Sequence, residues 1–186
     1  MSTTTLLLYS KATGTVLSAA TVAAAPDGEI SATQLAGDAF PARYFSALPS
    51  TPLSVSVPSD ELAVLAVDSA VVPVDQAFTR LVDLGDKSPG SLDDTRTISV
   101  DANASSSGLK VTFTPGAVGK TTVWMRAEPV ETNGTPAQTL TAQPNVTTAG
   151  SAMSVQMPVQ NFQSGTYRAL TMIPGCVPSL STFTVS

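Results

Sequence analysis

The sequence predicts an all-β protein built from two small β-domains, and three features lead to this prediction. Runs such as Leu109 to Thr114 alternate apolar with hydroxyl-bearing or charged side chains, which gives a strand one buried face and one wet face. Short runs of this kind are separated by breaks that contain Gly, Pro or Asn. Thr and Val, which favour strands, are frequent, whereas charged residues make up only 12% of the chain.

Residues 1–85 are predicted to form an N-terminal β-rich domain. Strong turn signals, such as Pro26-Asp27-Gly28, separate its apolar runs. Prolines at both ends of the run 52–58 confine that strand to an edge of a sheet or keep it short. The expected strands cover residues 6–9, 15–22, 52–58 and 62–67, with further candidates at 29–35 and 70–74.

A short helix is a second possibility near residues 75–84. Asp75 stands at the N-cap position, Gly85 stands where a C-cap would fall, and Phe78 and Leu81 would share one helical face. The same letters also alternate as a strand, so both interpretations remain open. Residues 86–94, which are polar and rich in turn formers, are predicted to be the linker between the two domains.

Three aromatic residues between Gly37 and Leu48 follow neither a helical nor a strand period: Phe40, Tyr44 and Phe45. One interpretation is a loop or short helical turn that closes one end of a barrel or sandwich. The other is an aromatic platform on which a ligand stacks, or an interface.

Residues 95–186 carry strand patterns at the regular spacing of a two-sheet fold. Trp124, the only tryptophan, and Tyr167 are its candidate core markers. Seven strands are expected, over residues 96–101, 109–114, 121–127, 138–142, 152–159, 166–172 and 181–185.

Two of these residues carry a resemblance to a known family. Trp124 falls on the third expected strand, and Gly165-Thr166-Tyr167 opens the sixth. In these features the second half resembles the immunoglobulin-like and fibronectin type III-like superfamily, which implies a seven-stranded β-sandwich. Paired cysteines are absent, and Ala169 stands where the second would fall, so the resemblance is to disulfide-free members. Such domains occur on phage tails, capsids, contractile injection particles and bacterial surface proteins. Residues 1–85 resemble no family.

The composition argues against most kinds of chemistry. The chain has no histidine, its one cysteine is Cys176, and its nine Lys and Arg residues are scattered over a chain of net charge −5. This pattern disfavours nucleic-acid binding and leaves no recognisable nucleophile with its base. Gly116 to Thr121 lacks the first glycine of a phosphate loop and precedes a strand pattern. We expect no enzyme activity, no cofactor and no metal site.

The function expected from these observations is structural. We expect a self-associating component of a larger particle, such as a phage-like capsid or tail, in a decoration or connector role. Its partners would be other copies of itself and other structural proteins, without nucleic acid and without a membrane span. The sequence start has no signal-peptide pattern, so we expect synthesis in the cytoplasm and incorporation into a virion or similar particle. The alternative is a glycan- or receptor-binding surface module that uses Phe40, Tyr44 and Phe45.

Overall fold

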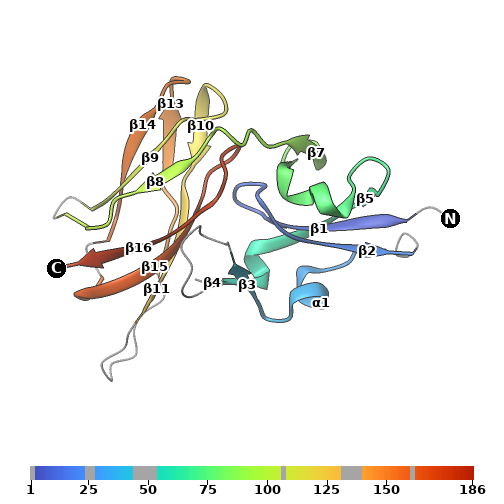
Figure 1. Ribbon diagram of the computed structural model, residues 1–186, viewed down its shortest axis with the longest axis horizontal. Helices are drawn as coiled ribbons and strands as arrows, with labels where there is room; N and C mark the ends of the chain where they lie inside the picture. The colour runs from blue at the N-terminus through green and yellow to red at the C-terminus, as the bar shows by residue number, and fades with distance from the viewer. Residues whose placement is uncertain (1–2, 24–27, 44–53, 106–107, 131–139, 160–161) are drawn as a thin grey trace. The chain divides into compact units, whose positions relative to one another are not determined.

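The computed structural model describes residues 3–23, 28–43, 54–105, 108–130, 140–159 and 162–186 (Figure 1). Strands dominate the described residues, and the prediction of an all-β protein is confirmed. The chain divides into two compact units. The first unit takes in residues up to Phe40 together with Ser56–Asp93, and the second takes in Pro41–Val55 together with Asp94–Ser186.

The first unit is built on a three-stranded antiparallel sheet. Its central strand, β1 (Thr4–Ser10), pairs on one side with β2 (Val16–Val22) and on the other with β5 (Leu62–Asp68). All seven residues of β1 are buried, because this strand is covered on both faces and both edges. The Gly14 turn joins β1 to β2 with a positive φ of 72°, which glycine adopts without strain.

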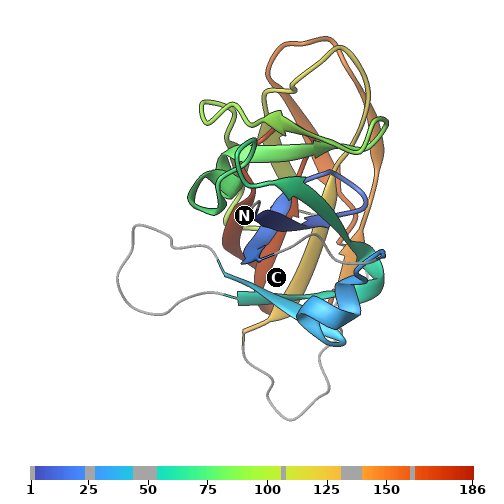
Figure 2. The same cartoon turned by 90° about the vertical axis from the view of Figure 1, so that its right-hand side faces the viewer.

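Short elements surround this sheet. The helix α1 (Ala32–Ala36) lies beside β5 and the 3-10 turn η1 (Ser59–Glu61), as Figures 1 and 2 show. The core on the other face of the sheet gathers residues from β1, β2 and the chain after β5: Leu7, Tyr9, Val16, Val72, Ala77 and Val82. The remaining elements of this unit are η2 (Val74–Thr79) and the hairpin β6 (Arg80–Asp83) with β7 (Ser88–Ser91). The paired strands β3 (Ala39–Arg43) and β4 (Ser54–Pro58) are each divided between the two units.

Three local predictions for this unit are wrong. The helix over 75–84 is replaced by the 3-10 turn η2 and the strand β6, because Val82 is buried by pairing with β7 rather than by a helical face. The apolar run 70–74 turns directly after β5 and then enters η2. The candidate strand 29–35 contains α1 instead, because Ser31 and Gln34 form a capping box that starts a helix.

The predicted linker over residues 86–94 contains the strand β7. This strand pairs with β6 through a regular antiparallel register from Arg80↔Ser91 to Asp83↔Ser88. The polar, turn-rich letters that suggested a linker therefore belong to a hairpin of the first unit, and the chain leaves that unit after Asp93.

The second unit contains two larger antiparallel sheets that share one hydrophobic core. The four-stranded sheet has the order β12-β11-β15-β16 and the three-stranded sheet the order β14-β9-β8. Side chains from both sheets meet in the core, among them Phe113 from β9 and Phe183 from β16. The strands are β8 (Ile98–Val100), β9 (Leu109–Phe113), β11 (Trp124–Pro129), β12 (Leu140–Ala142), β14 (Met153–Met157), β15 (Gly165–Met172) and β16 (Ser179–Val185).

A separate two-stranded sheet, β10 (Gly119–Thr122) with β13 (Asn145–Thr148), completes the unit. The strand predicted over 121–127 is divided between β10 and β11, since Val123 leaves the ladder and donates its N–H to the carbonyl oxygen of Pro144 at 3.0 Å. The strand β13 was not predicted, because its letters, Asn-Val-Thr-Thr, are polar and lie only partly buried.

One buried hydroxyl in this core gives a stability prediction. Thr171 is fully buried on β15, and its Oγ1 has no hydrogen-bond partner among the described residues. We expect Thr171→Val to raise the free energy of unfolding by about 1 kcal/mol, because an unpaired hydroxyl loses its water on folding. Thr148→Val is the matched control: its Oγ1 donates to the carbonyl oxygen of Ala117 at 2.6 Å, so this change should lower stability by about 1–2 kcal/mol. Urea unfolding of both variants measures the difference, and a loss of stability in Thr171→Val would contradict the prediction.

Candidate functional site

A hollow among the described residues lies in the first unit, along β5. Its volume is about 530 Å³. Five consecutive residues of β5, Leu62 to Ala66, line it. Successive side chains of a strand point to opposite faces, so a single hollow that touches all five must follow the edge of the strand rather than one face. We name this hollow the β5-edge groove.

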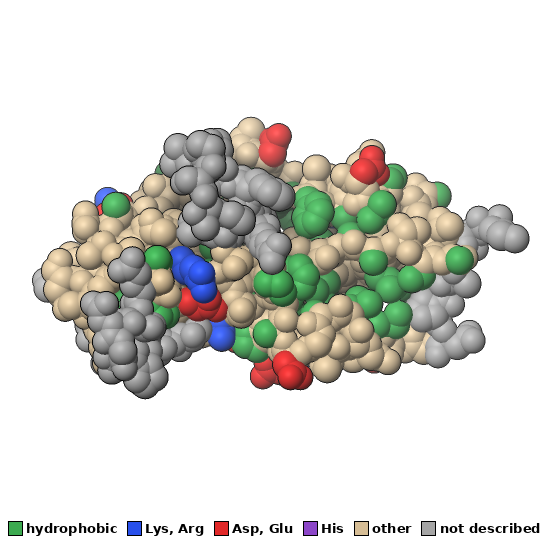
Figure 3. Space-filling view, turned by 60° about the horizontal axis from the view of Figure 1, so that its bottom comes forward, with side chains coloured by type: hydrophobic (Ala, Val, Ile, Leu, Met, Phe, Trp, Pro, Cys, Tyr) green, Lys and Arg blue, Asp and Glu red, His purple; other side chains and the backbone are tan. Residues whose placement is uncertain are grey.

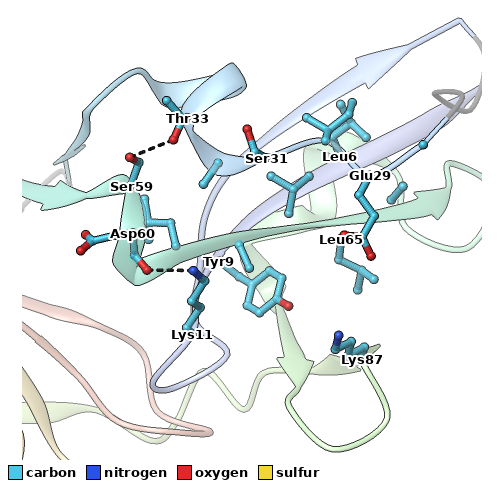
Figure 4. Close-up of a pocket in the computed structure, with 17 residues that line it drawn as sticks. Leu6, Tyr9, Lys11, Glu29, Ser31, Thr33, Ser59, Asp60, Leu65 and Lys87 are labelled. Atoms are coloured by element: carbon cyan, nitrogen blue, oxygen red, sulfur yellow. Dashed lines mark hydrogen bonds between the residues drawn. The ribbon is translucent and has the colours of Figure 1, made fainter.

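Two groups of residues form the sides of the β5-edge groove, and Figure 4 shows β5 running between them. Ser31 and Thr33 lie on the side of α1, whereas Tyr9 and Lys87 lie on the other side. The side near α1 is fixed by the capping box. The Ser31 N–H donates to Gln34 Oε1 at 2.7 Å, and the Gln34 N–H donates to Ser31 Oγ at 3.3 Å.

Hydrogen bonds also order the end of the groove near η1. Lys11 Nζ donates to the carbonyl oxygen of Asp60 at 2.8 Å, and the hydroxyls of Thr33 and Ser59 lie 3.2 Å apart (Figure 4). At the other end Lys87 follows the β6–β7 turn with a left-handed φ of 49°. The turn holds this conformation through Asp83, whose Oδ1 accepts the N–H of Gly85 at 2.8 Å.

Tyr9 links the groove to the core of the first unit. Its side chain is only 6% exposed and its ring packs with the core residues on that face of the sheet, yet the residue also lines the groove. No described residue forms a hydrogen bond with its hydroxyl. Burial raises the pKa of the Tyr9 phenol above its ordinary value of 10.0.

The raised pKa predicts an alkaline instability. Above pH 10.0 the unfolded chain loses the Tyr9 proton while the folded chain keeps it, so the free energy of unfolding falls from there up to the raised folded pKa. In Tyr9→Phe this part of the slope should be absent. Denaturant unfolding at a series of alkaline pH values measures it, with absorbance of tyrosinate as an independent readout. An identical slope in the wild type and in Tyr9→Phe would contradict the prediction.

The residues singled out from the sequence do not form this site. Phe40 lies in β3 and is half-buried, whereas Tyr44 and Phe45 lie outside the described residues. Trp124 and Tyr167 are 1% and 4% exposed in the second unit. Sequence reasoning missed the groove, although two signals were present: the long apolar run of β5 without proline, and the Ser31-x-x-Gln34 capping box beside it.

Trp124 and Tyr167 occupy different faces of the four-stranded sheet. Tyr167 belongs to the shared core, where its ring stacks on Phe183 with centroids 5.5 Å apart, and its hydroxyl donates to the carbonyl oxygen of Gln163 at 2.9 Å. The neighbours of Trp124 in the chain, Val123 and Met125, also point into the shared core. Trp124 must therefore point to the opposite face of the sheet, where it is nevertheless buried.

Other kinds of site receive no support from the described residues. Within the described ranges, no three His, Cys, Asp or Glu side chains lie together as a metal ion would require. The Cys176 thiol is buried and contacts the carbonyl oxygen of Thr114 at 3.4 Å. None of the described helices has the length and apolar character needed to cross a membrane. Comparisons of this chain with protein-family models, with curated proteins and with solved structures found no match.

Proposed function

We propose that the protein is a non-enzymatic structural component that associates with copies of itself in a larger particle, such as a phage-like capsid or tail. The observation that carries the proposal is the β5-edge groove, where an apolar strand edge has no partner in the described part of the chain. An unpaired edge of this kind favours pairing with another polypeptide. A decoration or connector role, in a virion or similar particle, is the concrete form of the proposal.

Exposed apolar side chains support the same function. Val71 is 60% exposed and Phe78 is 57% exposed, and both lie in the short stretch after β5. Figure 3 shows apolar side chains gathered on one face of the first unit, with isolated acidic side chains around them. A surface with many apolar groups and few charges causes little repulsion between identical copies.

The second unit is proposed to be an immunoglobulin-like β-sandwich of the disulfide-free kind. In chain order, β8, β9 and β14 match strands A, B and E of that fold, and β11, β15 and β16 match C, F and G. The strand β12 beside β11 takes the place of the additional C′ strand. The Tyr167–Gln163 hydrogen bond has the form of a tyrosine corner. The orientation of Trp124 away from the shared core is a departure from the fold, which places its strand-C tryptophan inside.

Sedimentation velocity at increasing protein concentration tests the proposed assembly. Concentration-dependent growth of the sedimenting species is expected, together with co-purification of structural partners from the native source. A strict monomer at high concentration, with no partner retained in a pull-down, would overturn the proposal.

A second candidate function is a glycan- or receptor-binding module, and the Tyr9 hydroxyl, which has no hydrogen-bond partner in the described part of the chain, favours it. This hydroxyl lines the groove together with Lys11, Glu29 and Lys87, so the groove offers both donors and acceptors to a polyol. A glycan array with the wild type, Tyr9→Phe and Tyr44→Ala tests this candidate. Sugar binding that is lost in Tyr9→Phe would locate it in the groove, whereas loss only in Tyr44→Ala would favour the aromatic cluster of residues 40–45.

A further inference from the structure

The free edge of β5 has a defined set of backbone donors and acceptors. Two hydrogen bonds bracket the β1–β5 ladder: the Lys11 N–H donates to the carbonyl oxygen of Glu61 at 3.0 Å, and the Ser69 N–H donates to that of Thr3 at 3.1 Å. Both pairs belong to the register that runs from Thr4↔Asp68 to Ser10↔Leu62.

Hydrogen-bonded and non-hydrogen-bonded pairs alternate along an antiparallel ladder. Ala63, Leu65 and Val67 therefore use their backbone groups on β1. The backbone groups of the intervening residues point away from β1, toward the groove; these residues are Leu62, Val64, Ala66 and Asp68.

Two of those outward groups are already satisfied. The Leu62 N–H donates to the carbonyl oxygen of Ser59, and the Asp68 carbonyl oxygen accepts the N–H of Val71 at 2.9 Å. Among the described residues no partner is found for the remaining six outward groups: the Leu62 C=O, the N–H and C=O of both Val64 and Ala66, and the Asp68 N–H.

We infer that this edge pairs with the same edge of a second copy, antiparallel, about a two-fold axis at Leu65. In that register Val64 of one copy lies opposite Ala66 of the other, and the N–H of each residue donates to the carbonyl oxygen of its partner. The two-fold axis repeats this pair, so it forms twice. The Asp68 N–H then donates to the Leu62 carbonyl oxygen of the other copy. All six free groups on each strand obtain a partner, and the two satisfied groups are the only ones that the pairing does not need.

The uncharged sequence of β5 suits a second copy of this chain as the partner of its edge. From Leu62 to Val67 the strand carries no charge, no proline and no bulge, so two copies approach without repulsion. A highly charged peptide would find no complementary row of charges along this stretch. The result would be a continuous six-stranded sheet with the order β2-β1-β5-β5-β1-β2.

The edge of β16 differs from that of β5 because part of it is bridged by the chain before β9. The Ala104 N–H donates to the Thr184 carbonyl oxygen at 2.8 Å, and the Thr184 N–H donates to the Ala102 carbonyl oxygen at 2.9 Å. The chain around Asn103 thereby forms a short parallel bridge to Thr184.

The test uses charge at Ala66, which is exposed and therefore tolerates a long side chain in the monomer. In the inferred pairing the two Ala66 side chains are diagonal neighbours on one face, within reach of long side chains. Ala66→Lys and Ala66→Glu should each weaken dimerisation by about tenfold or more through like-charge repulsion. An equimolar mixture of the two variants should restore the dimer, since Lys then faces Glu.

Ala20→Lys is a closely matched control. Ala20 and Ala66 are both exposed, and both face Leu6 of the central strand, one from β2 and the other from β5. The same charge on the β2 edge should leave the dimer intact. Sedimentation velocity gives the oligomeric state of every sample, and circular dichroism verifies that each variant keeps its strands.

The inference rests on the proposed self-association, and the outcomes separate the two. If the wild type associates and both Ala66 variants associate equally well, the β5 pairing is wrong and the assembly proposal stands. If both variants are monomeric and their mixture is also monomeric, the edge is used but the two-fold register is wrong. A wild type that stays monomeric at every concentration would overturn both.

Discussion

Phe113→Ala is expected to lower the free energy of unfolding of the second unit by about 3–5 kcal/mol. Phe113 is 2% exposed, and it belongs to the core that both sheets share. Truncation leaves a cavity that the neighbouring strands can fill only in part. The loss of stability therefore includes both the transfer free energy of the removed ring atoms and the packing contacts that the cavity no longer makes. Because total stabilities are about 5–15 kcal/mol, a change of this size brings the unit close to its unfolding threshold.

The measurement is urea unfolding followed by the fluorescence of Trp124, the only tryptophan, which lies in the same unit. Val118→Ala is the control, because that valine is 76% exposed in the same unit and a truncation at the surface should change stability by no more than about 0.5 kcal/mol. Equal effects of the two substitutions would show that the shared core is not where the structure places it.

Gly14→Ala is expected to destabilise the first unit by about 3 kcal/mol or more. Gly14 has a φ of 72°, and a Cβ at this position would collide with the carbonyl oxygen of Val82. The approach is fixed from both sides, because the Val82 N–H donates to the Gly14 carbonyl oxygen at 2.8 Å and the Gly14 N–H donates to that of Ser10 at 2.9 Å. The alanine therefore lowers stability in two ways: its left-handed φ is strained, and the backbone must shift to make room for the Cβ.

Gly37→Ala separates these two contributions. Gly37 has a φ of 66° and a ψ of −148°, a conformation that favours glycine, but no described atom lies within 4 Å of the position that its Cβ would take. Only the backbone strain remains, about 1–3 kcal/mol. Thermal unfolding followed by far-ultraviolet circular dichroism compares the variants. Equal melting temperatures for Gly14→Ala and Gly37→Ala would mean that the close approach at Val82 is not rigid.

The fold class could be predicted because side-chain alternation is a local signal. Leu109, Val111 and Phe113 face the core while Lys110 is exposed between them, as the sequence pattern requires. The central strand β1 could also be found, because its uninterrupted apolar letters suit a strand that is covered on both faces. These predictions depend on burial alone, which hydrophobicity reports directly.

The failures occur where two local patterns compete or where pairing decides. Residues 75–84 fit a helix and a strand equally well, and the structure divides them between the 3-10 turn η2 and the strand β6, which pairs with β7. Ser31 to Ala36 became a helix through a capping box, which outweighs a weak strand pattern. The apolar run of β5 and the capping box beside it were visible in the sequence, but they did not locate the β5-edge groove, because an edge is defined by which strands are absent beside it and strand order is not a local property of the letters.

The short bridge between Asn103 and Thr184 has a further consequence for how far assembly can grow. In the inferred pairing, two copies joined through their β5 edges form a closed pair, because the two-fold axis uses the same edge of both copies. A copy without the bridge at Thr184 would expose more of the β16 edge and could bind a further neighbour through it. Assemblies without a fixed length would then be the geometric outcome, so the bridge around Asn103 would limit the growth of the inferred assembly.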